Sequence, residues 1–441
     1  MKTFKIGGIC PPEYKLYASE KIKVAPLPKQ AIISLSQHSG NPAIPVVKNG
    51  DTVKVGQLIA KADGFISSNI HSPFSGTVLK IEDALDVSGY KNPAIWIDVI
   101  GDEWDEKIDK TKTLNFTCSL DSKQIIKKIA DCGVVGLGGA SFPTHVKLTI
   151  PKDKKAEILI INAVECEPYL TSDYQLMLLK GKEIMYGIHI LMKAVGVKET
   201  IIGIESNKKD VIDLFEKLAT RFLGISVVAL KYKYPQGGEK QLIESTLGRR
   251  VPSGKLPIDI GVVVQNVATA YAVYEAVQKN KPLIERVITV TGESLKKPIN
   301  VLARIGTPFS GLIELVGGLP EDTGKIVAGG PMMGKALSDL EVPVIKGTSG
   351  LLIIPKTESV RKEVQNCTRC AKCINACPMG LEPYLLMTLA EHSLWDRMEK
   401  EHIMDCIECG CCLFTCPSNR PLLDYVRYGK QTVAKLIKNI N

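Results

Sequence analysis

The sequence has no long apolar run, and its charges are not gathered in one place. No stretch of 18 consecutive apolar residues occurs in the 441-residue chain, so we expect no transmembrane span. The first residues, M-K-T-F-K-I-G-G, contain no apolar core long enough for a secretory signal peptide. The formal net charge is +9, but basic residues are interleaved with acidic ones, and we expect no nucleic-acid partner. An acidic protein partner or a membrane-embedded complex would account for the charge equally well.

Cysteine is concentrated near the end of the chain. Nine of the 13 Cys lie between Cys367 and Cys416, and the other four are scattered, as expected in a reducing cytosol. Two runs, C-T-R-C-A-K-C-I-N-A-C-P and C-I-E-C-G-C-C-L-F-T-C-P, follow the pattern C-x2-C-x2-C-x3-C-P. This spacing is typical of bacterial [4Fe–4S] centres, in which three close thiolates hold one cubane and the fourth, before Pro, ligates the other.

The spacing therefore predicts two [4Fe–4S] clusters with crossed ligands, and Cys411 is expected to be spare. The first cluster site would consist of Cys367, Cys370, Cys373 and Cys416. The second cluster site would consist of Cys406, Cys409, Cys412 and Cys377. Structural zinc sites use paired C-x2-C knuckles instead of four-Cys runs ending in Pro, and disulfides need an oxidising compartment. The spacer 381–405 has apolar residues at helical spacing, so we expect an amphipathic helix there and a helical ferredoxin-like domain over 355–441.

The first hundred residues read as an extended arm followed by a small β domain. Residues 1–29 are rich in Pro and Lys. Within 30–110, the two half-motifs V-V-K-N-G-D-T-V-K-V-G-Q-L-I-A and I-H-S-P-F-S-G-T-V-L-K-I resemble the barrel-sandwich fold of lipoyl and biotinyl carrier domains. The segment between them, K-A-D-G-F-I-S-S-N, offers no clear carrier lysine, so we expect a structural or docking role. His38 and His71 are expected to be packing or hydrogen-bonding residues, and neither is assigned to a metal.

The middle of the chain alternates strand and helix signals. Apolar, β-branched segments such as I-L-I-I-N and I-G-V-V-V-Q are typical of buried parallel strands, and amphipathic segments lie between them. Residues 111–285 are therefore expected to form a doubly wound α/β domain. Strand and turn signals return over 286–354, which predicts a small β-rich module before the ferredoxin-like domain.

Four segments of the α/β domain carry residues suited to ligand binding. Two are glycine-rich, G-L-G-G-A-S-F-P-T-H-V-K-L and Y-P-Q-G-G-E-K-Q-L-I, and neither is a Walker A or a G-x-G-x-x-G loop. Consecutive glycines let backbone N–H groups approach a phosphate or a flat ring. The other two, I-N-A-V-E-C-E-P-Y-L and Q-N-V-A-T-A, place polar residues at strand ends, where open α/β sheets bind ligands. A tight turn with a buried Phe142 is the alternative for the first loop.

Together these four segments resemble the flavin-binding subunit of respiratory complex I, in the same order along the chain. Over nearly its full length the chain is also similar to the C subunit of the Rnf electron-transport complex, through P-P-E-Y-K, Q-H-S-G-N-P-A-I-P, E-C-E-P-Y-L-T-S-D, G-R-R-V-P-S-G-K-L-P, R-I-G-T-P-F and both Cys runs. The resemblance implies a noncovalent FMN and an NAD(H) site in a Rossmann-like domain. It also implies that 286–354 is a soluble-ligand-binding β-grasp module.

The resemblance also implies roles for single residues. Those carried over to FMN are Gly136, Gly138, Gly139, Lys147, Asn162, Glu165, Tyr234, Gly237, Asn266 and Thr269. Those carried over to the nicotinamide nucleotide are Phe142, Glu167 and Glu239. The sequence departs from the complex I pattern at Val164, which replaces Asp, and at Gly238, which replaces the first Glu of G-E-E. Cys10 stands where the Rnf family commonly has His.

These parts predict a defined task. NAD(H) exchanges two electrons as a hydride and a cluster moves one, so a flavin must lie between them. The resemblance implies a peripheral subunit on the cytoplasmic face of the membrane that exchanges electrons with ferredoxin indirectly, while partner subunits move Na+ or H+. The alternatives are a soluble NADH-dependent paralogue that feeds a corrinoid or other reductase, and a scaffold with structural clusters. Residues 1–110 are expected to dock on the partners; the basic C-terminal segment 427–441 is either a rival anchor or an ordinary helix packed on the ferredoxin-like domain.

Overall fold

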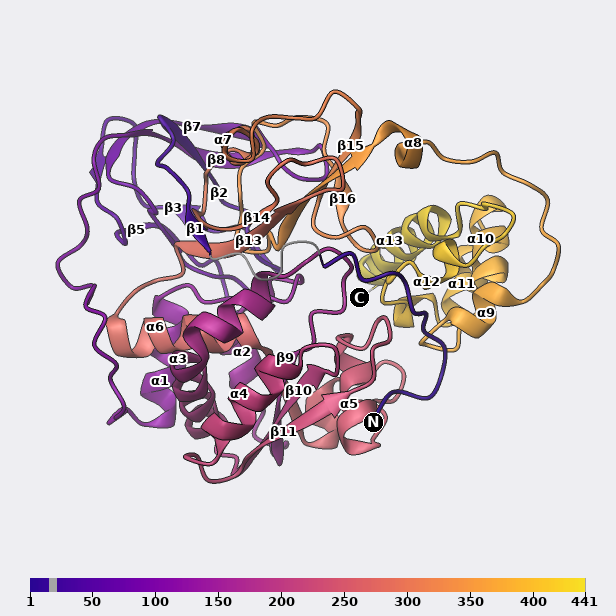
Figure 1. The fold of residues 1–441 in the computed structure, drawn as a ribbon, viewed down its shortest axis with the longest axis horizontal. Helices are drawn as coiled ribbons and strands as arrows, with labels where there is room; N and C mark the ends of the chain where they lie inside the picture. The colour runs from indigo at the N-terminus through magenta and orange to yellow at the C-terminus, as the bar shows by residue number, and fades with distance from the viewer. Residues whose placement is uncertain (16–21, 441) are drawn as a thin grey trace.

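The structure is a computed structural model, and it describes residues 1–15 and 22–440. The part of the predicted arm at 16–21 lies outside the described residues. Four bodies follow one another along the chain, and the helical one lies at one end of the molecule, beyond the sheets of the other three (Figure 1). No helix in the described ranges is both long enough and apolar enough to cross a membrane.

The first body is a sandwich of two small antiparallel sheets. One sheet has the order β2 (Gln30–Ser34), β8 (Lys91–Val99), β7 (Gly76–Leu85), β4 (Thr52–Val53). The other has the order β3 (Ile44–Pro45), β5 (Leu58–Lys61), β6 (Ile70–His71). Alternate residues of the strands, among them Ile33, Ile59 and Ile95, are fully buried in one core between the sheets. Each sheet can bury only one face, so the pattern of alternation specifies the sandwich.

The second body is built on a parallel sheet with the order β11 (Ile225–Leu230), β10 (Glu199–Glu205), β9 (Ile158–Ala163), β12 (Val262–Asn266). The prediction of buried parallel strands is confirmed. In β9, Leu159 and Ile161 pack into the core on one face, while Ile158 and Ile160 pack on the other face. Helices cover both faces: α1 (Ser122–Asp131), α2 (Thr144–Leu148), α3 (Ser172–Val195), α4 (Lys209–Ala219), α5 (Glu239–Leu247), η1 (Pro257–Ile260) and α6 (Val267–Lys279).

The third body is a six-stranded mixed sheet with one helix. Its order is β1 (Lys23–Val24), β14 (Ile299–Arg304), β13 (Glu285–Thr291), β17 (Gly350–Pro355), β15 (Thr323–Ala328), β16 (Lys335–Ala336). Helix α7 (Phe309–Leu315) supplies Phe309 and Leu312 to the core of this module. Strand β1 belongs to the N-terminal arm, so the arm is not wholly free: it completes the edge of this sheet.

The fourth body is a small helical domain. Its elements are α8 (Lys356–Ser359), α9 (Lys372–Ala376), α10 (Pro383–Glu391), α11 (Trp395–Lys400), η2 (Ile403–Asp405), α12 (Cys411–Phe414) and α13 (Leu422–Ile440). The single amphipathic helix predicted for the spacer is wrong. The spacer forms α10 and α11 instead, because Ser393 adopts a left-handed backbone with φ +54° that ends the first helix. On α13, Val433 is buried in the core of this domain, so the packed helix is the arrangement that the structure shows for the C-terminal segment.

Residues 2–15 of the arm pack against the second and fourth bodies. Phe4 is 1% exposed, and Lys15 is half-buried, with its Nζ donating to carbonyl oxygens of the loop after β9. These two residues are therefore not available for a partner, as docking through the whole of 1–110 would require.

Candidate functional site

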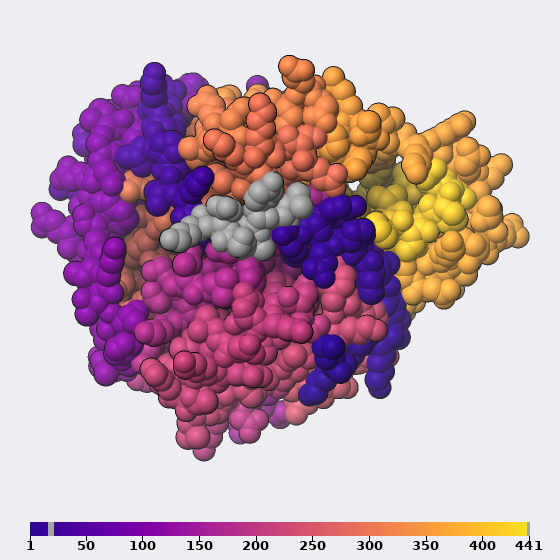
Figure 2. All heavy atoms as spheres, in the orientation of Figure 1, coloured from indigo at the N-terminus to yellow at the C-terminus, as the bar shows by residue number. Residues whose placement is uncertain are grey.

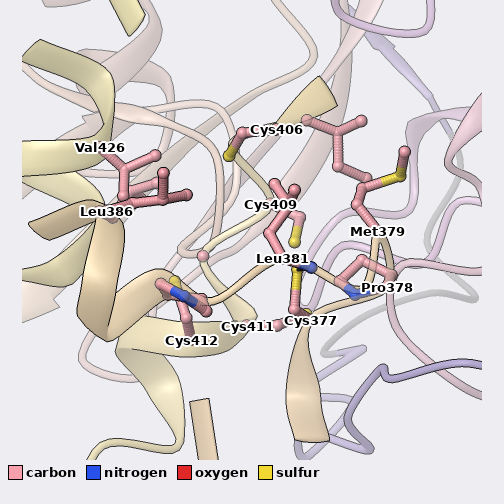
Figure 3. Close-up of a pocket in the computed structure, with 14 residues that line it drawn as sticks. Cys377, Pro378, Met379, Leu381, Leu386, Cys406, Cys409, Cys411, Cys412 and Val426 are labelled. Atoms are coloured by element: carbon pink, nitrogen blue, oxygen red, sulfur yellow. Dashed lines mark hydrogen bonds between the residues drawn. The ribbon is translucent and has the colours of Figure 1, made fainter. Parts of the chain in front are cut away.

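The second Cys run and Cys377 surround one hollow in the helical domain. Cys377, Cys406, Cys409, Cys411 and Cys412 line a hollow that, together with the solvent at its mouth, encloses about 380 Å³ (Figure 3). Most of the remaining wall is apolar, formed by Leu381, Leu386, Ile407, Leu423, Val426 and neighbouring residues. The structure thus brings Cys377, the expected fourth ligand, beside the thiols of the second run, from which it is distant in sequence.

The donor set of this hollow fits a cubane cluster. Burial raises the pKa of the Cys406 thiol to about 11, and burial also raises the pKa of Cys412 and Cys377. Thiolates in such an apolar place need a compensating positive charge, which cluster iron supplies. Within residues 1–15 and 22–440, no three metal-ligating side chains converge as closely as one metal ion requires. A cubane has four iron corners, each taking its own thiolate, so its ligands stand further apart.

The first cluster site is more open. Cys367 and Cys370 are exposed, while Cys373 and Cys416 are half-buried. The pKa of Cys373 is raised by burial and, to a lesser degree, by the nearby Cys416. Ser418, which follows the second Cys run, is bonded to the segment just before the first run. Its carbonyl oxygen accepts from the Gln365 N–H at 2.9 Å, and its hydroxyl donates to the Asn366 carbonyl at 3.0 Å. The end of the second run therefore lies beside the start of the first.

The polar residues at the strand ends meet at one edge of the parallel sheet. Asn162 of β9 lies opposite Gly203 of β10 on one side and opposite Asn266 of β12 on the other. Asn266 caps α6, since its Oδ1 accepts from the N–H groups of residue 268 at 2.9 Å and of Thr269 at 3.2 Å. The Thr269 hydroxyl in turn accepts from the backbone N–H of Leu137 at 2.9 Å, which holds the first glycine-rich loop at this edge.

The first glycine-rich loop is open where its glycines are. Gly138 and Gly139 are exposed, whereas Gly136 and Phe142 are half-buried and paired, Gly136 N–H donating to the Phe142 carbonyl at 2.8 Å. Gly139 has φ +116°, and no described atom lies within 4 Å of the position a Cβ would take there. A flat ring or a phosphate could approach this backbone closely.

Three contacts join the glycine-rich loops to each other and to the strands at the sheet edge. Lys147 of α2 forms an ion pair with Glu239 at the start of α5, with 2.5 Å between Nζ and Oε1. Its Nζ also donates to the carbonyl of Val264 at 3.1 Å. Asn162 Nδ2 donates to the carbonyl of Gly237 at 2.8 Å. The predicted FMN and nucleotide residues of three segments are thus brought together.

The two predicted glutamates of the β9–α3 loop make bonds within the protein. The Glu165 carboxylate accepts from the backbone N–H groups of Asp173 at 2.7 Å and of residue 174 at 3.0 Å, so it caps α3. The Glu167 carboxylate accepts from the N–H groups of Met332 at 3.3 Å and Met333 at 2.8 Å. These contacts with the third body are not foreseeable from the motif. Burial raises the pKa of Glu167 to about 7.

Tyr234 connects this edge with the second cluster site. The residue is 1% exposed, and its hydroxyl donates to the carbonyl of Cys409 at 2.9 Å. Tyr234, Cys409 and Cys411 share one apolar cluster with the half-buried Cys166 and Met332. Cys411 packs between the two bodies and also lines the hollow of the second cluster site, so its expected spare role stays a prediction. Of the two cluster sites, the second is the one in contact with the sheet edge.

The barrel-sandwich body also touches the first glycine-rich loop. The Ser39 hydroxyl donates to the carbonyl of residue 140 at 2.8 Å, and His145 lies within 3.3 Å of the Phe65 carbonyl oxygen. Nearby, the buried Lys346 donates to the carbonyls of Asn69 at 2.7 Å and of residue 133 at 2.8 Å, and burial lowers its pKa to about 7. His38 is a hydrogen-bonding residue here, with its Nε2 2.9 Å from the Asn41 carbonyl oxygen, and burial lowers the pKa of His38 to about 4 and of His71 to about 3.

Some residues at the edge were not assigned from the sequence. Gln265 Nε2 and Arg286 Nε are buried, and neither has a hydrogen-bond partner within the described part of the chain. Asp173 accepts from Asn266 Nδ2 at 2.7 Å, and burial together with the Glu165 charge raises its pKa to about 7. Gln265 was signalled by its place at a strand end. Arg286 and Asp173 do not lie at the end of a predicted strand, and they come close to the other residues of the site only in the folded chain.

Comparison with protein-family models divides the chain in the same order. The matches are an RnfC barrel sandwich hybrid domain over residues 2–102, the Nuo51 FMN-binding domain over 129–275, an SLBB domain over 287–336 and a 4Fe-4S dicluster domain over 359–417. These matches, with the sheet-edge site and the thiol-lined hollow, define an iron–sulfur flavoprotein.

Curated relatives make the family specific. The chain is 44% identical to the C subunit of the proton-translocating ferredoxin:NAD(+) oxidoreductase complex of Clostridium ljungdahlii, covering 98% of this chain and 94% of that one. It is 41% identical to the C subunit of the Na(+)-translocating complex of Acetobacterium woodii, covering 98% and 97%. The chain belongs to the family of Rnf C subunits, and the resemblance seen in its motifs is confirmed.

Solved structures show the same fold at low identity. A crystal structure of an NAD+-reducing [NiFe]-hydrogenase in the H2-reduced state is 18% identical, with a TM-score of 0.51, and the match covers 71% of this chain and 63% of that one. The air-oxidised form gives the same TM-score at 17% identity. At this identity the likeness concerns the fold alone.

Proposed function

We propose that this chain is the NAD(H)-reacting oxidoreductase subunit of an Rnf-type electron-transport complex. The observation that carries the proposal is the contact of Tyr234 with Cys409, which joins the sheet edge to the second cluster site. A chain with a nucleotide site and two clusters needs this kind of junction, because electrons must leave the site one at a time. FMN, when bound, takes up two electrons together from NADH and gives them up singly.

The FMN site lies at the carboxyl edge of the parallel sheet. The exposed backbone of Gly138 and Gly139 would hold the flavin or its phosphate, and Lys147 would supply a positive charge. Asn162, Asn266 and Thr269 hold the loops of the edge in place, and the unpartnered Gln265 Nε2 is a donor toward the ligand. The remaining residues assigned to this site are Gly136, Glu165, Tyr234 and Gly237, of which Glu165 acts through the cap of α3.

The nicotinamide nucleotide approaches from the side of Phe142 and Glu239. Both are half-buried, so part of each side chain remains open to a ligand. Glu167 acts on this side through the loop that holds Met332 and Met333, since its carboxylate is occupied there. Glu239 forms an ion pair with Lys147, so a ligand that binds one of these charged groups also lies close to the other.

The clusters act in a fixed order in this proposal. The second cluster site touches the sheet edge through Tyr234, so it exchanges electrons with the flavin first. The first cluster site, with the exposed Cys367 and Cys370, exchanges electrons with the partner subunits. An exposed outer cluster and a buried inner one suit a chain that carries electrons between its own nucleotide site and another protein.

The architecture and the setting complete the proposal. Residues 111–285 form a Rossmann-like domain, 286–354 a β-grasp module, and the segments 1–29, 30–110 and 355–441 the arm, the barrel-sandwich domain and the ferredoxin-like domain. The relatives are named for H+ or Na+ translocation coupled to ferredoxin and NAD(+). Partner subunits couple electron transfer to ion translocation. This chain binds them peripherally at the cytoplasmic face of the membrane.

The test uses the full chain, loaded anaerobically with FMN and iron–sulfur clusters. NADH is mixed with the protein, and flavin and cluster absorbance are followed separately. We expect flavin bleaching followed by cluster bleaching, and co-purification with integral membrane subunits from the native host. A protein that binds FMN yet is not reduced by NADH would disprove the proposal. Co-purification with a soluble reductase instead would favour the soluble paralogue.

A further inference from the structure

The N-terminal arm lies along the seam between the α/β domain and the helical cluster-binding domain. In Figure 2 the indigo atoms of the arm follow the border between the magenta body and the orange and yellow body. The arm is far in sequence from the four ligand-binding segments and from both Cys runs, and neither its charge nor its Pro content predicts this course. Three short parts of residues 2–15 make the contacts, and each contacts a different part of the site.

The first part anchors the arm on the α/β domain. Lys2 pairs with the end of β11: its carbonyl accepts from the backbone N–H of residue 231 at 2.9 Å. Phe4 is fully buried, and Lys233 lies over its ring, with 3.9 Å from Nζ to the ring centroid. The same Nζ donates to the Phe4 carbonyl at 3.1 Å. The arm is thus fixed to the segment that leads directly to Tyr234.

The second part lies between Tyr234 and the second cluster site. Ile9 and Tyr234 exchange two backbone hydrogen bonds, both 2.8 Å long. The Gly8 N–H donates to the carbonyl of Ala376, the residue before Cys377, at 2.9 Å. Gly7 has φ +63°, and a Cβ there would lie 2.3 Å from the carbonyl oxygen of Cys377. Only glycine fits this approach, so backbone of the arm touches both the tyrosine and the cluster-ligand run.

The third part holds the loop after β9. The Glu13 carbonyl accepts from the N–H of Tyr169 at 3.0 Å, and the Tyr14 ring stacks on the Tyr169 ring with centroids 4.7 Å apart. Lys15 Nζ donates to the carbonyls of Glu165 at 3.0 Å, Glu167 at 2.8 Å and residue 170 at 2.5 Å. Burial lowers the pKa of Lys15. A buried amine surrounded by three carbonyls of one loop fixes the shape of that loop.

We infer that residues 2–15 act as a strap that positions the second cluster site relative to the Tyr234 segment and the loop after β9. Gly7 and Lys15 are its positioning residues. The inference rests on the proposed function, because it concerns electron transfer between the flavin site and this cluster. The strap contacts Cys377, Tyr234 and the Glu165–Glu167 loop, which also meet through Cys166 in the apolar cluster of Tyr234 and Cys409. Displacing it would change their spacing without removing any cluster ligand or any residue assigned to bind a ligand.

The experiment compares Gly7→Ala with Gly196→Ala in the full, cofactor-loaded chain. Gly196 has a similar left-handed backbone, φ +73°, but no described atom lies within 4 Å of its Cβ position, so it controls for backbone strain alone. Lys15→Met tests the strap from its other end without a change of backbone, and Lys5→Met at an exposed position of the same arm is its control. Iron and FMN content are measured first for every variant.

Two readouts decide the outcome. In the cofactor-free chain, hydrogen exchange at the amides of Gly8, Ile9 and Tyr234 should become faster in Gly7→Ala and not in Gly196→Ala. In the loaded chain, flavin bleaching by NADH should keep its rate. Electron transfer slows as the donor and acceptor move apart, so we expect cluster bleaching to become slower in the strap variants than in their controls.

The results separate failure of the strap from failure of the proposed function. If the wild-type chain is not reduced by NADH, the proposed function is wrong. The role of the strap is then tested by hydrogen exchange in the cofactor-free chain alone. If Gly7→Ala and Lys15→Met match their controls in both exchange and cluster bleaching, the strap is refuted. If either variant slows flavin and cluster bleaching equally, the arm supports the nucleotide site alone, and its role between flavin and cluster is overturned. Should Gly7→Ala fail to fold, Lys15→Met carries the same comparison.

Discussion

Replacing Cys377 by Ser should remove one cluster and leave the other in place. The thiol of Cys377 is 8% exposed and lines the hollow with Cys406, Cys409 and Cys412, although it belongs in sequence to the other run. A hydroxyl is a poorer ligand than a thiolate for iron in a cluster. We therefore expect Cys377→Ser to damage the second cluster and not the first. The matched variant is Cys416→Ser, which should damage the first cluster and not the second.

The size of the effect follows from two cubanes of four iron atoms each. The wild-type chain should hold about eight iron atoms and each variant about four. The variants should then differ in what NADH can reduce. In Cys416→Ser the second cluster, beside Tyr234, remains and should be bleached. In Cys377→Ser the remaining first cluster has lost its connection to the flavin and should stay oxidised while the flavin is reduced.

The assay is anaerobic reconstitution, iron analysis and stopped-flow mixing with NADH, with dithionite as a reductant that reaches either cluster. An iron content near four in the wild-type chain, or zinc in place of iron, would contradict the two-cluster interpretation. If Cys377→Ser lost the cluster that starts at Cys367, the crossed pairing would be wrong. If its remaining cluster were bleached by NADH at the wild-type rate, the crossed ligand pairing would be correct. The proposed order, in which the flavin exchanges electrons with the second cluster first, would be wrong.

Three further predictions test the sheet edge and its junction. Glu239→Gln or Phe142→Ala should weaken NADH oxidation with an artificial acceptor while FMN stays bound; loss of FMN with normal kinetics on added flavin would refute this division of the site. Tyr234→Phe leaves the buried Cys409 carbonyl without its donor and should lower the free energy of unfolding by about 1–3 kcal/mol in denaturant titrations, whereas the exposed Tyr90→Phe should leave it unchanged. Burial raises the pKa of Glu167 from 4.5 to about 7, so its contribution to stability is complete below pH 4.5 and is lost as pH rises through about 7. Glu167→Gln should flatten that part of the stability–pH curve, and an unchanged curve would show that Glu167 does not titrate there.

The sequence by itself determined the chemistry and the family. Ligand spacing in a Cys run is local, because three ligands of each cluster lie within seven residues, so the clusters can be predicted before any fold is known. The parallel strands are also predictable, since a strand buried on both faces must be apolar throughout, as β9 is. The glycine-rich loops and the polar strand ends that meet at the sheet edge are also predictable, because each is a short motif that can be read locally in the sequence.

Only the tertiary structure decided how the parts are joined. The carboxylates of Glu165 and Glu167 look alike in the motif, yet one caps α3 and the other binds a loop of the third body, because their partners lie elsewhere in the chain. The spacer is two helices because Ser393 adopts a left-handed backbone, which no periodicity records. The arm, expected to be an extended segment that docks on partners, packs Gly7 against Cys377 and Lys15 against the loop after β9. Contacts between residues hundreds of positions apart depend on how the domains pack, and local sequence patterns carry no information about that packing.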